Sequence, residues 1–543
     1  MRAQEKAKEK GKEVSRRTFV KKVAVGFAGI TSLSIGAGCT QSQPGESEGI
    51  TGSDTATILP DIWDRETDVL VLGGGGAGLC AAISAHDAGA DVLVLEKFIA
   101  CAGATSVSGG MCAGAGHRTQ IKHGIEDSPE KFYEDWLIAG GKCNDPELLH
   151  PLTEMSGETI NWLEDLGVEL KDEVAVDGAG NNTPRAVYSM PYGTGQGWMT
   201  GLNAAAEERG IEILLETPAV KLYRNEIGRI VGAEAEDSSG KVMAVKAKKA
   251  VILATGGIAN SLDKVKLYTP ATKEIIEKAT RFVTACWPTC TGDGIDMARA
   301  VDADIYMYAP YHACCSVPNN NSGDDGAALL VPAMFGVDGC IAVNQNGERF
   351  CNEMSTEDNV ARDGAWNNQP GMVQYVIIDA VMAELPTTKG FVFDRIIQPW
   401  LKSGNNAVQK ADSLDELATK TGMPPENLKA TVEKWNGYME QDFDPEFNRP
   451  SGYFGAGINV SPFYSVQIIP GVNMSKGGLR VNTKAQTLNS KYEVIPGLYS
   501  AGEVASGQIQ GSARFHINGG GLQQAFSFGR IAGEAAASET PWE

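Results

Sequence analysis

The residues with the clearest chemical potential in this 543-residue chain are a cluster of glycines and the acidic residue that follows it. Gly73, Gly75 and Gly78 have the spacing G-x-G-x-x-G. In this motif the first glycine permits a tight turn, the second lets a pyrophosphate approach the backbone, and the third lets a helix pack on a strand. Glu96 lies further along, where a carboxylate can accept hydrogen bonds from ribose hydroxyls. These residues predict a bound dinucleotide and redox chemistry, and by themselves they allow either NAD or FAD.

Two strands and a helix must position these residues. Residues 68–72 and 91–95 are aliphatic runs that predict buried strands, and the small residues between them predict a helix. The pyrophosphate would then lie at the positive end of the helix dipole. A third aliphatic run, residues 250–254, ends in a glycine turn of the kind that closes such a domain over its cofactor. The predicted fold class is therefore α/β, with a Rossmann-like domain.

The chain between these strands contains other recognisable patterns. Residues 101–110 form a loop of small residues that suits close approach of the backbone to a flavin ring or its phosphates. Residues 128–170 have the apolar spacing of helices, and residues 199–208 predict one more helix. Residues 211–247 have the alternation of a short β-meander.

Composition bounds the class of protein. The hydrophobic content of 42% and the charged content of 21% are ordinary for a globular chain, and the length favours two domains around one cofactor. The formal net charge of -21 argues against nucleic acid as a partner. An acidic surface suits either simple solubility or docking to a basic electron carrier.

The first fifty residues predict an export signal and linker. Arg16 and Arg17 stand in the sequence Ser-Arg-Arg-Thr-Phe, and residues 23–38 carry no charge, which is a twin-arginine pattern. The uncharged run is shorter than the roughly 20 residues that span a bilayer, so we expect a cleaved signal. Lipidation at Cys39 is left open. The expected location is the periplasm or the outer face of the cytoplasmic membrane.

Several motifs occur together and in a fixed order. Besides residues 73–78 with Glu96, they are Ala254-Thr-Gly-Gly257, Thr291-Gly-Asp-Gly294, Gly347-Glu-Arg-Phe-Cys-Asn-Glu353 and Pro496-Gly-Leu-Tyr-Ser-Ala-Gly-Glu503. This combination resembles the flavoprotein subunit of the fumarate reductase and succinate dehydrogenase family, in its soluble, exported branch, over about residues 64 to 535.

The resemblance implies FAD as the cofactor and a domain order. Residues 1–50 would be the signal and linker, residues 51–305 and 471–543 the two parts of an FAD-binding domain, and residues 306–470 an inserted α+β capping domain. The catalytic site would lie between the FAD-binding and capping domains. The residues expected at the cofactor are Gly73, Gly75, Gly76, Ala77, Gly78, Glu96, Lys97, Gly103, Ala104, Thr105, Ser108, Gly109, Gly110, Val220, Ala254, Thr255, Gly256, Asp293, Gly502, Glu503, Gly520, Gly521 and Leu522.

The family chemistry is hydride transfer from flavin N5 to an activated carbon–carbon double bond, with a protein acid protonating the neighbouring carbon. In fumarate reductases this acid is an arginine in a Thr-Arg-Asp sequence. The corresponding run here is Thr356-Glu357-Asp358, so Glu357 would be a different acid. Arg362 could reach the site from the next helical turn. The alternative is that both residues lie on a helix surface.

Other family positions also differ. His312 matches the substrate-binding histidine, whereas Val331-Pro332 replaces a Thr-Glu pair and Met474 replaces a second histidine. The last binding arginine corresponds to either Arg514 or His516.

The predicted site therefore has fewer charged residues to bind a four-carbon dicarboxylate than the family's fumarate reductases have. We expect a larger, flatter or less charged substrate, such as an aryl- or heteroaryl-acrylate or a ring enone. Tyr311 or His312 would donate the proton and Arg514 would bind a carboxylate, with Tyr308, Asn473 and Met474 as further lining residues.

The eleven cysteines contain no C-x-x-C-H haem motif and no ferredoxin spacing. Burial as small apolar thiols is one interpretation. A cluster or metal assembled from distant cysteines is the other, and it would draw on those near the predicted capping domain: Cys286, Cys290, Cys314, Cys315, Cys340 and Cys351.

The absence of a second G-x-G-x-x-G disfavours direct use of a nicotinamide. We therefore expect an external electron donor, a membrane-linked multihaem cytochrome. Three functions stay open: an ene-reductase in anaerobic respiration, an FAD-dependent dehydrogenase of ketosteroid type, and a non-catalytic flavin electron-transfer subunit. The oligomeric state is open too.

Overall fold

The computed structural model describes residues 58–175, 180–191, 194–237, 239–284, 286–306, 313–316, 339–353, 365, 368–384, 397–449, 457–511 and 517–543. A separate unit, residues 1–52, lies outside this set, and with it the predicted twin-arginine motif and Cys39. None of the helices in the described ranges is long and apolar enough to cross a membrane.

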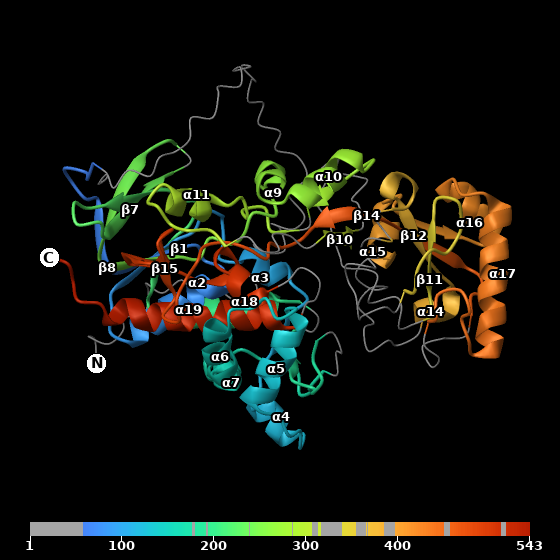
Figure 1. Ribbon diagram of the computed structural model, residues 1–543, viewed down its shortest axis with the longest axis horizontal. Helices are drawn as coiled ribbons and strands as arrows, with labels where there is room; N and C mark the ends of the chain where they lie inside the picture. Colours follow the sequence, from blue (N-terminus) through green and yellow to red (C-terminus); the bar gives the residue numbers. More distant parts are fainter. Residues whose placement is uncertain are drawn as a thin grey trace, which may run out of the picture. The chain divides into compact units, whose positions relative to one another are not determined.

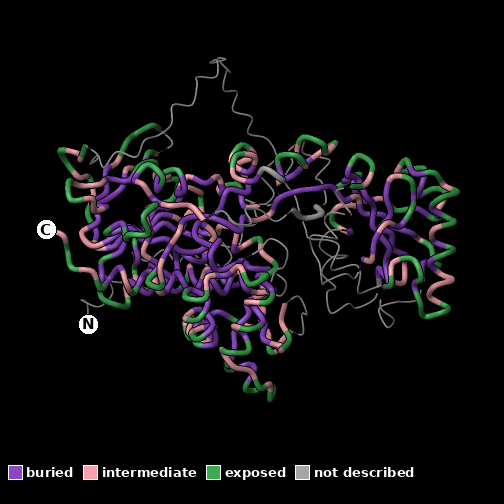
Figure 2. The backbone as a smooth tube through the Cα atoms, in the orientation of Figure 1, coloured by how far each residue is buried: buried purple, intermediate pink, exposed green. Residues whose placement is uncertain are grey.

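An eight-stranded sheet, mostly parallel, forms the centre of the larger core (Figure 1). β1 pairs in parallel with β2 and β8, and β8 pairs in parallel with β16. The strands of this sheet are β1 (Arg65–Leu72), β2 (Val92–Leu95), β5 (Glu212–Leu214), β6 (Ala219–Arg224), β7 (Ile230–Glu236), β8 (Val242–Leu253), β15 (Gln486–Leu488) and β16 (Val494–Ser500). The central strands are buried (Figure 2), as expected where aliphatic parallel strands are covered on both faces.

β8 differs from the sequence prediction. Residues 241–247 and 250–254 were expected as two strands, and the structure joins them into one. Residues 242–246 of β8 pair antiparallel with β7, and residues 245–253 pair in parallel with β1. A register shift between Thr67 and Val69 of β1 accommodates the long strand.

Two helices from opposite ends of the chain pack together on this sheet. α2 (Gly76–Asp87) follows the glycine motif, and α19 (Gly520–Ser538) is the last helix (Figure 1). A Cβ added to Gly529 would lie 2.5 Å from the carbonyl oxygen of Ala77, so the small residues of both helices permit close backbone approach. The two ends of the chain therefore build one core, which excludes water from the base of the glycine motif.

The stretch predicted as helical, residues 128–170, contains three helices, which are α5 (Pro129–Ala139), α6 (Pro146–Glu154) and α7 (Ser156–Asp165). Ser128 and Asp145 cap the first two by accepting backbone N–H groups, and each is followed by a proline at the first helical position. Gly140 ends α5. The predicted helix at 199–208 is the second part of α8 (Gln196–Glu208).

A six-stranded, mostly antiparallel sheet forms the centre of a second core. Its strands are β9 (Val283–Thr284), β10 (Ala313–Ser316), β11 (Ile341–Asn344), β12 (Gln374–Ile378), β13 (Val408–Ala411) and β14 (Phe463–Val472). β14 is the organising strand, because it pairs with β9, β10, β12 and β13. The helices packed here include α16 (Leu414–Thr421) and α17 (Pro425–Gln441). The predicted domain limits at residues 305 and 470 stay a prediction.

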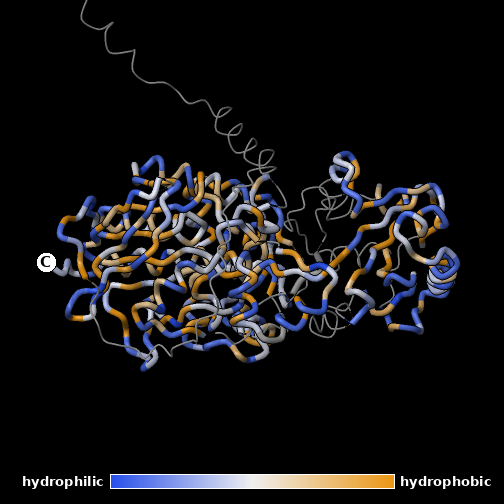
Figure 3. The backbone as a smooth tube through the Cα atoms, turned by 90° about the horizontal axis from the view of Figure 1, so that it is seen from above, coloured by the Kyte–Doolittle hydropathy of each residue, from blue (hydrophilic) through white to orange (hydrophobic). Residues whose placement is uncertain are grey.

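Shorter elements complete the described chain. They are α3 (Gly103–Val107), β3 (Met111–Ala113), α4 (Arg118–Lys122), β4 (Ala186–Tyr188), α9 (Leu262–Tyr268), α10 (Pro270–Lys278), α11 (Asp293–Arg299), η2 (Pro370–Met372), α14 (Ala380–Glu384), α15 (Gln398–Ser403), η4 (Gly502–Val504) and α18 (Gly507–Gln510). Hydrophobic segments lie mainly inside, and hydrophilic segments lie mainly at the outside (Figure 3).

Candidate active site

The turn between β1 and α2 requires glycine at two positions of the motif. Gly73 has φ +108°, and a Cβ there would collide with the carbonyl oxygen of Ala254 on β8. A Cβ at Gly78 would collide with the carbonyl oxygen of Gly73. Gly75 is the N-cap of α2, without a capping side chain, and so the helix begins with its backbone N–H groups directed into the turn. This is the arrangement that binds a pyrophosphate.

The Glu96 side chain is hydrogen-bonded to this turn. Its two carboxylate oxygens accept the backbone N–H groups of Gly74 at 2.6 Å and of Phe98 at 2.7 Å. The side chain is only 5% exposed, and burial raises its pKa against the opposing effect of these two hydrogen bonds. Each oxygen keeps one lone pair, so the carboxylate can still accept a ribose hydroxyl.

Lys97 and Asp293 form an ion pair beside Glu96. The Lys97 ammonium donates to Asp293 Oδ2 and to Thr291 Oγ1, both at 2.7 Å. Asp293 begins α11, and so the Thr-Gly-Asp-Gly motif brings a carboxylate to the carboxyl end of β2. Both side chains are about one-third exposed, which leaves them accessible to a ligand in the turn.

The loop at residues 101–110 approaches the glycine motif as predicted, although part of it forms α3. The backbone N–H of Gly76 donates to Thr105 Oγ1 at 3.2 Å. Gly75 and Gly103 face one another closely enough that a Cβ on Gly103 would lie 2.9 Å from the Gly75 Cα. Ala104 lies in α3, and Ser108 is its C-cap residue. By contrast, a Cβ on Gly109 would meet no described atom within 4 Å, so this backbone borders open space.

The carboxyl end of β8 contributes Ala254, Thr255 and Gly256. Thr255 Oγ1 is buried and has no hydrogen-bond partner among the described residues.

Gly110, at the end of the small-residue loop, is held by Trp198, whose indole N–H donates to its carbonyl oxygen at 2.8 Å. Val220, on β6, is 45% exposed, and its predicted cofactor contact stays a prediction.

The far end of the chain completes the site. Gly502 contacts α2, since a Cβ there would lie 2.8 Å from the Ala77 side chain. Glu503 is held by Ser475, whose N–H and Oγ donate to one carboxylate oxygen at 2.6 and 2.9 Å. Burial raises the pKa of Glu503. Ser475 was not predicted, because nothing in the local sequence indicates a partner that lies on another element.

α19 presents a second helix N-terminus to the same region. Gly520 packs against Trp136 of α5, whereas a Cβ at Gly521 would meet no described atom within 4 Å. Leu522 is 9% exposed. The open backbone at Gly109 and Gly521, the unpartnered Thr255 hydroxyl and the two glycine-rich helix starts fit a large dinucleotide such as FAD.

The six predicted catalytic residues lie outside the described residues. They are Tyr311, His312, Glu357, Arg362, Arg514 and His516, and Tyr308 lies outside them as well. Two of the predicted lining residues are described. Asn473 and Met474 follow β14 directly and are half-buried, and Asn473 Oδ1 has no partner among the described residues.

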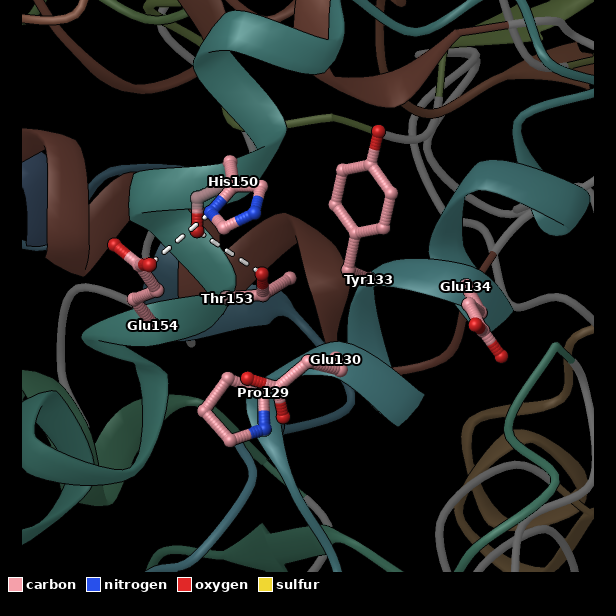
Figure 4. Close-up of a pocket in the computed structure, with 7 residues that line it drawn as sticks. All are labelled: Pro129, Glu130, Tyr133, Glu134, His150, Thr153 and Glu154. Carbon is pink, nitrogen blue, oxygen red and sulfur yellow. Dashed lines mark hydrogen bonds and ion pairs between the residues drawn. The ribbon is translucent and has the colours of Figure 1, made fainter.

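A hollow lies between α5 and α6, and none of the predicted site residues lines it (Figure 4). Its lining includes Tyr133, Glu130 and His150, and His150 Nδ1 forms an ion pair of 3.1 Å with Glu154. Since it is open to solvent, acidic and free of glycine-rich backbone, it does not fit a dinucleotide.

Known proteins match nearly the whole chain. The family model described as "FAD binding domain" matches residues 68–519. The chain is 32% identical over 489 residues to a fumarate reductase (cytochrome) of Shewanella frigidimarina, covering 89% of this chain and 79% of that one. It is 31% identical over 490 residues to a urocanate reductase of Eggerthella lenta, covering 88% and 76%.

Solved structures show the same fold. The open conformation of a flavocytochrome c3 fumarate reductase matches with a TM-score of 0.74 and 30% identity, over 88% of this chain and 78% of that one. A 3-ketosteroid-Δ4-(5α)-dehydrogenase of Rhodococcus jostii RHA1 matches with a TM-score of 0.65 and 28% identity, over 89% and 99%. These matches confirm the predicted α/β fold class and the predicted cofactor, FAD.

Proposed function

We propose that this chain, which belongs to the FAD-binding-domain family of flavoproteins, reduces an activated carbon–carbon double bond of an organic acceptor. It is an FAD-dependent oxidoreductase. The names of the relatives support the reaction, because fumarate and urocanate are both unsaturated carboxylic acids and both proteins are called reductases. Bound FAD would supply hydride transfer at its N5.

The chain's own residues supply binding and position. The backbone N–H groups at the start of α2 bind the pyrophosphate, and the Glu96 carboxylate accepts a ribose hydroxyl while it fixes the Gly74 N–H. The buried Thr255 hydroxyl offers a further polar contact to the cofactor. α19, packed on α2, excludes water from this end of the site.

One observation supports the substrate position that we propose. Ala313, the residue after His312, pairs with Val472 of β14, and Asn473 and Met474 follow Val472. The next residue, Ser475, donates to Glu503 in the predicted cofactor set. Residues 473–475 therefore lead from the end of β14, which pairs with Ala313, to the predicted cofactor site. Within the described residues the Asn473 amide oxygen has no hydrogen-bond partner.

We assign the proton donor to Tyr311 or His312, and carboxylate binding to Arg514 with His516 as the alternative. Glu357 and Arg362 are the other acids considered for protonation. The replacement of charged family residues at Glu357, Val331-Pro332 and Met474 favours an aryl- or heteroaryl-acrylate or an enone over fumarate.

The electron donor is an external protein, for which we propose a membrane-linked multihaem cytochrome outside the cytoplasmic membrane, in anaerobic respiration. The motivation is the absence of C-x-x-C-H and of a second nucleotide motif in the sequence. The word cytochrome in the name of the Shewanella relative points to the same kind of donor.

An anaerobic assay tests the function. The FAD-loaded protein is mixed with reduced viologen and a panel of acrylates and enones, with fumarate as the comparison. Oxidation of viologen only in the presence of an unsaturated acceptor supports the proposal. His312→Ala should lose turnover and keep FAD, whereas unchanged turnover would remove His312 from the mechanism.

A second function has structural support, because the ketosteroid dehydrogenase shares the fold. A dehydrogenase would reduce an electron-accepting dye when given a saturated ketosteroid. Inertness in both assays with FAD bound would instead indicate the non-catalytic electron-transfer subunit.

A further inference from the structure

Two cysteines and one carboxylate meet at the edge of the cofactor site. The sulfur atoms of Cys286 and Cys290 and a carboxylate oxygen of Glu503 all lie within 4.8 Å of one another. The two cysteines flank a turn that follows β9, closed by a hydrogen bond of 3.0 Å from Cys290 N–H to the Trp287 carbonyl oxygen. Glu503 reaches them from η4, more than two hundred residues later in the chain.

Two glycines leave room for these side chains. A Cβ on Gly256 would lie 3.1 Å from Cys290 Sγ, and a Cβ on Gly257 would collide with the Glu503 carboxylate. The indole ring of Trp287 packs edge-on against Phe98, with the ring centres 5.0 Å apart. The cysteine turn is thus anchored to the segment that follows Glu96.

In the part of the chain that the structure describes, Glu503 has no basic side chain as a partner. Glu503 receives hydrogen bonds from the neutral N–H and hydroxyl of Ser475, and no ion pair between it and a basic side chain occurs within the described ranges. Burial of a carboxylate without a cation is costly, and two adjacent thiols offer no positive charge. A bound metal ion would give the carboxylate a directly coordinated cation.

We propose that Cys286, Cys290 and Glu503 bind one thiophilic divalent cation of the Zn²⁺ class. Thiolate sulfur and carboxylate oxygen are ligands that Zn²⁺ accepts together, and three protein ligands leave a fourth position for water. On binding, the two S–H bonds lose their protons to solvent and two metal–sulfur bonds form, so no oxidant or reductant is needed. Two thiolates and one carboxylate around a divalent ion leave a net charge of one negative unit.

Cobalt is a suitable probe because Co²⁺ substitutes for Zn²⁺ and its tetrahedral thiolate complexes absorb at longer wavelengths than oxidised flavin. The full-length, FAD-loaded protein, kept reduced with a phosphine, is titrated with Co²⁺ and then with Zn²⁺. We expect one Co²⁺ per chain with thiolate-type visible bands, which Zn²⁺ removes.

Cys286→Ser and Cys290→Ser should each bind Co²⁺ at least about tenfold more weakly, since even residues that only orient a metal ligand contribute that much. Cys143→Ser is the matched control, because Cys143 is also half-buried but lies outside the cluster, and it should bind as the wild type does. The FAD absorbance of each variant reports that it is folded and loaded.

Thiol alkylation gives an independent measurement on the unaltered protein. Zn²⁺ should protect Cys286 from alkylation, as read by peptide mass spectrometry, and should leave the labelling of Cys143 unchanged. The inference is overturned if the wild type shows no thiolate–cobalt bands, if both cysteine variants keep them, or if Zn²⁺ gives no protection. Turnover of an unsaturated substrate is not part of the measurement, so its failure would leave the proposed reaction intact.

Discussion

Glu96 Oε2 accepts the backbone N–H of Gly74 at 2.6 Å, and so the acid at the end of β2 is hydrogen-bonded to the glycine turn that it was expected to serve. The same side chain therefore does two things. It fixes the backbone of the turn, and it presents its remaining lone pairs to a ribose.

Glu96→Gln should weaken FAD binding. A glutamine amide nitrogen cannot accept a hydrogen bond, so either the Gly74 or the Phe98 N–H loses its acceptor. Loss of a hydrogen bond to a charged group costs roughly 1.5–3 kcal/mol, which corresponds to a dissociation constant raised about tenfold or more. Flavin fluorescence on titration of the apoprotein measures it. The exposed Glu226→Gln is the control, and equal affinities in both variants would contradict the role of Glu96.

Gly73→Ala should prevent stable folding of the FAD-binding core, whereas Gly89→Ala should be tolerated. Both glycines have positive φ, +108° and +87°. A Cβ at Gly73 meets the Ala254 carbonyl, and one at Gly89 meets no described atom within 4 Å. An alanine at either position would cost about 1–2 kcal/mol in backbone strain, and only the alanine at position 73 would also collide with a neighbouring atom. Soluble yield and denaturation midpoints distinguish them, and similar midpoints would refute the collision.

The Arg349-Phe-Cys-Asn-Glu353 motif has a structural role in the second core. Arg349 donates to both oxygens of Glu353 at 2.9 and 2.8 Å and to Asp444 at 2.9 Å, and all three side chains are nearly fully buried. The guanidinium groups of Arg349 and Arg449 each stack on Trp435, 4.5 and 4.7 Å from the ring centre. The motif therefore contributes an internal ion-pair network.

Glu353→Gln should destabilise this core by about 3–5 kcal/mol, because it removes one of the buried carboxylates that balance the charge of Arg349 and Arg449. Glu274→Gln, which removes an exposed ion pair with Lys278 on α10, should change stability by less than about 0.5 kcal/mol. Urea denaturation followed by tryptophan fluorescence, to which Trp435 contributes, would report the difference. Equal denaturation midpoints for the two variants would show that the network contributes little.

The free energy of unfolding should fall in acid because of the buried side chain of His117. Burial lowers the pKa of His117 from 6.5 to about 4, and the neutral ring is held by Gln120 N–H at Nδ1 and by the Arg185 carbonyl at Nε2. Between these two pH values the unfolded chain binds a proton that the folded chain does not, so stability increases with pH across this window. The contribution is on the order of 3 kcal/mol.

His117→Asn should flatten that part of the pH profile, since asparagine can cap α4 without titrating. The exposed His86→Asn serves as the comparison and should leave the slope unchanged. Thermal unfolding at a series of pH values between about 4 and 7 measures both variants. A wild-type slope in His117→Asn would assign the acid sensitivity to other groups.

Some structural details were beyond sequence reasoning. No strand was assigned to residues 463–472, where Pro470 and Gly471 interrupt the apolar run, and yet β14 is the strand on which the second sheet is built. The helical stretch at 128–170 was recognised, whereas its division at Gly140 and Met155 was not. Local preference is weak at such positions, and pairing with neighbouring strands or helices decides the outcome.

By itself the sequence determined the β1–α2–β2 unit, the glycine turn, the acid at Glu96 and, through the order of its motifs, the α/β fold and FAD. These features depend on residues that are close together in the chain, so the period of the hydrophobic residues and the spacing of the glycines predict them directly. Only the tertiary structure showed that Ser475 donates hydrogen bonds to Glu503 and that Lys97 pairs with Asp293. It also showed that Cys286 and Cys290 lie beside the buried carboxylate of Glu503. Such contacts join residues far apart in the chain, and they depend on which strands pair and in which register, for which local patterns carry no signal.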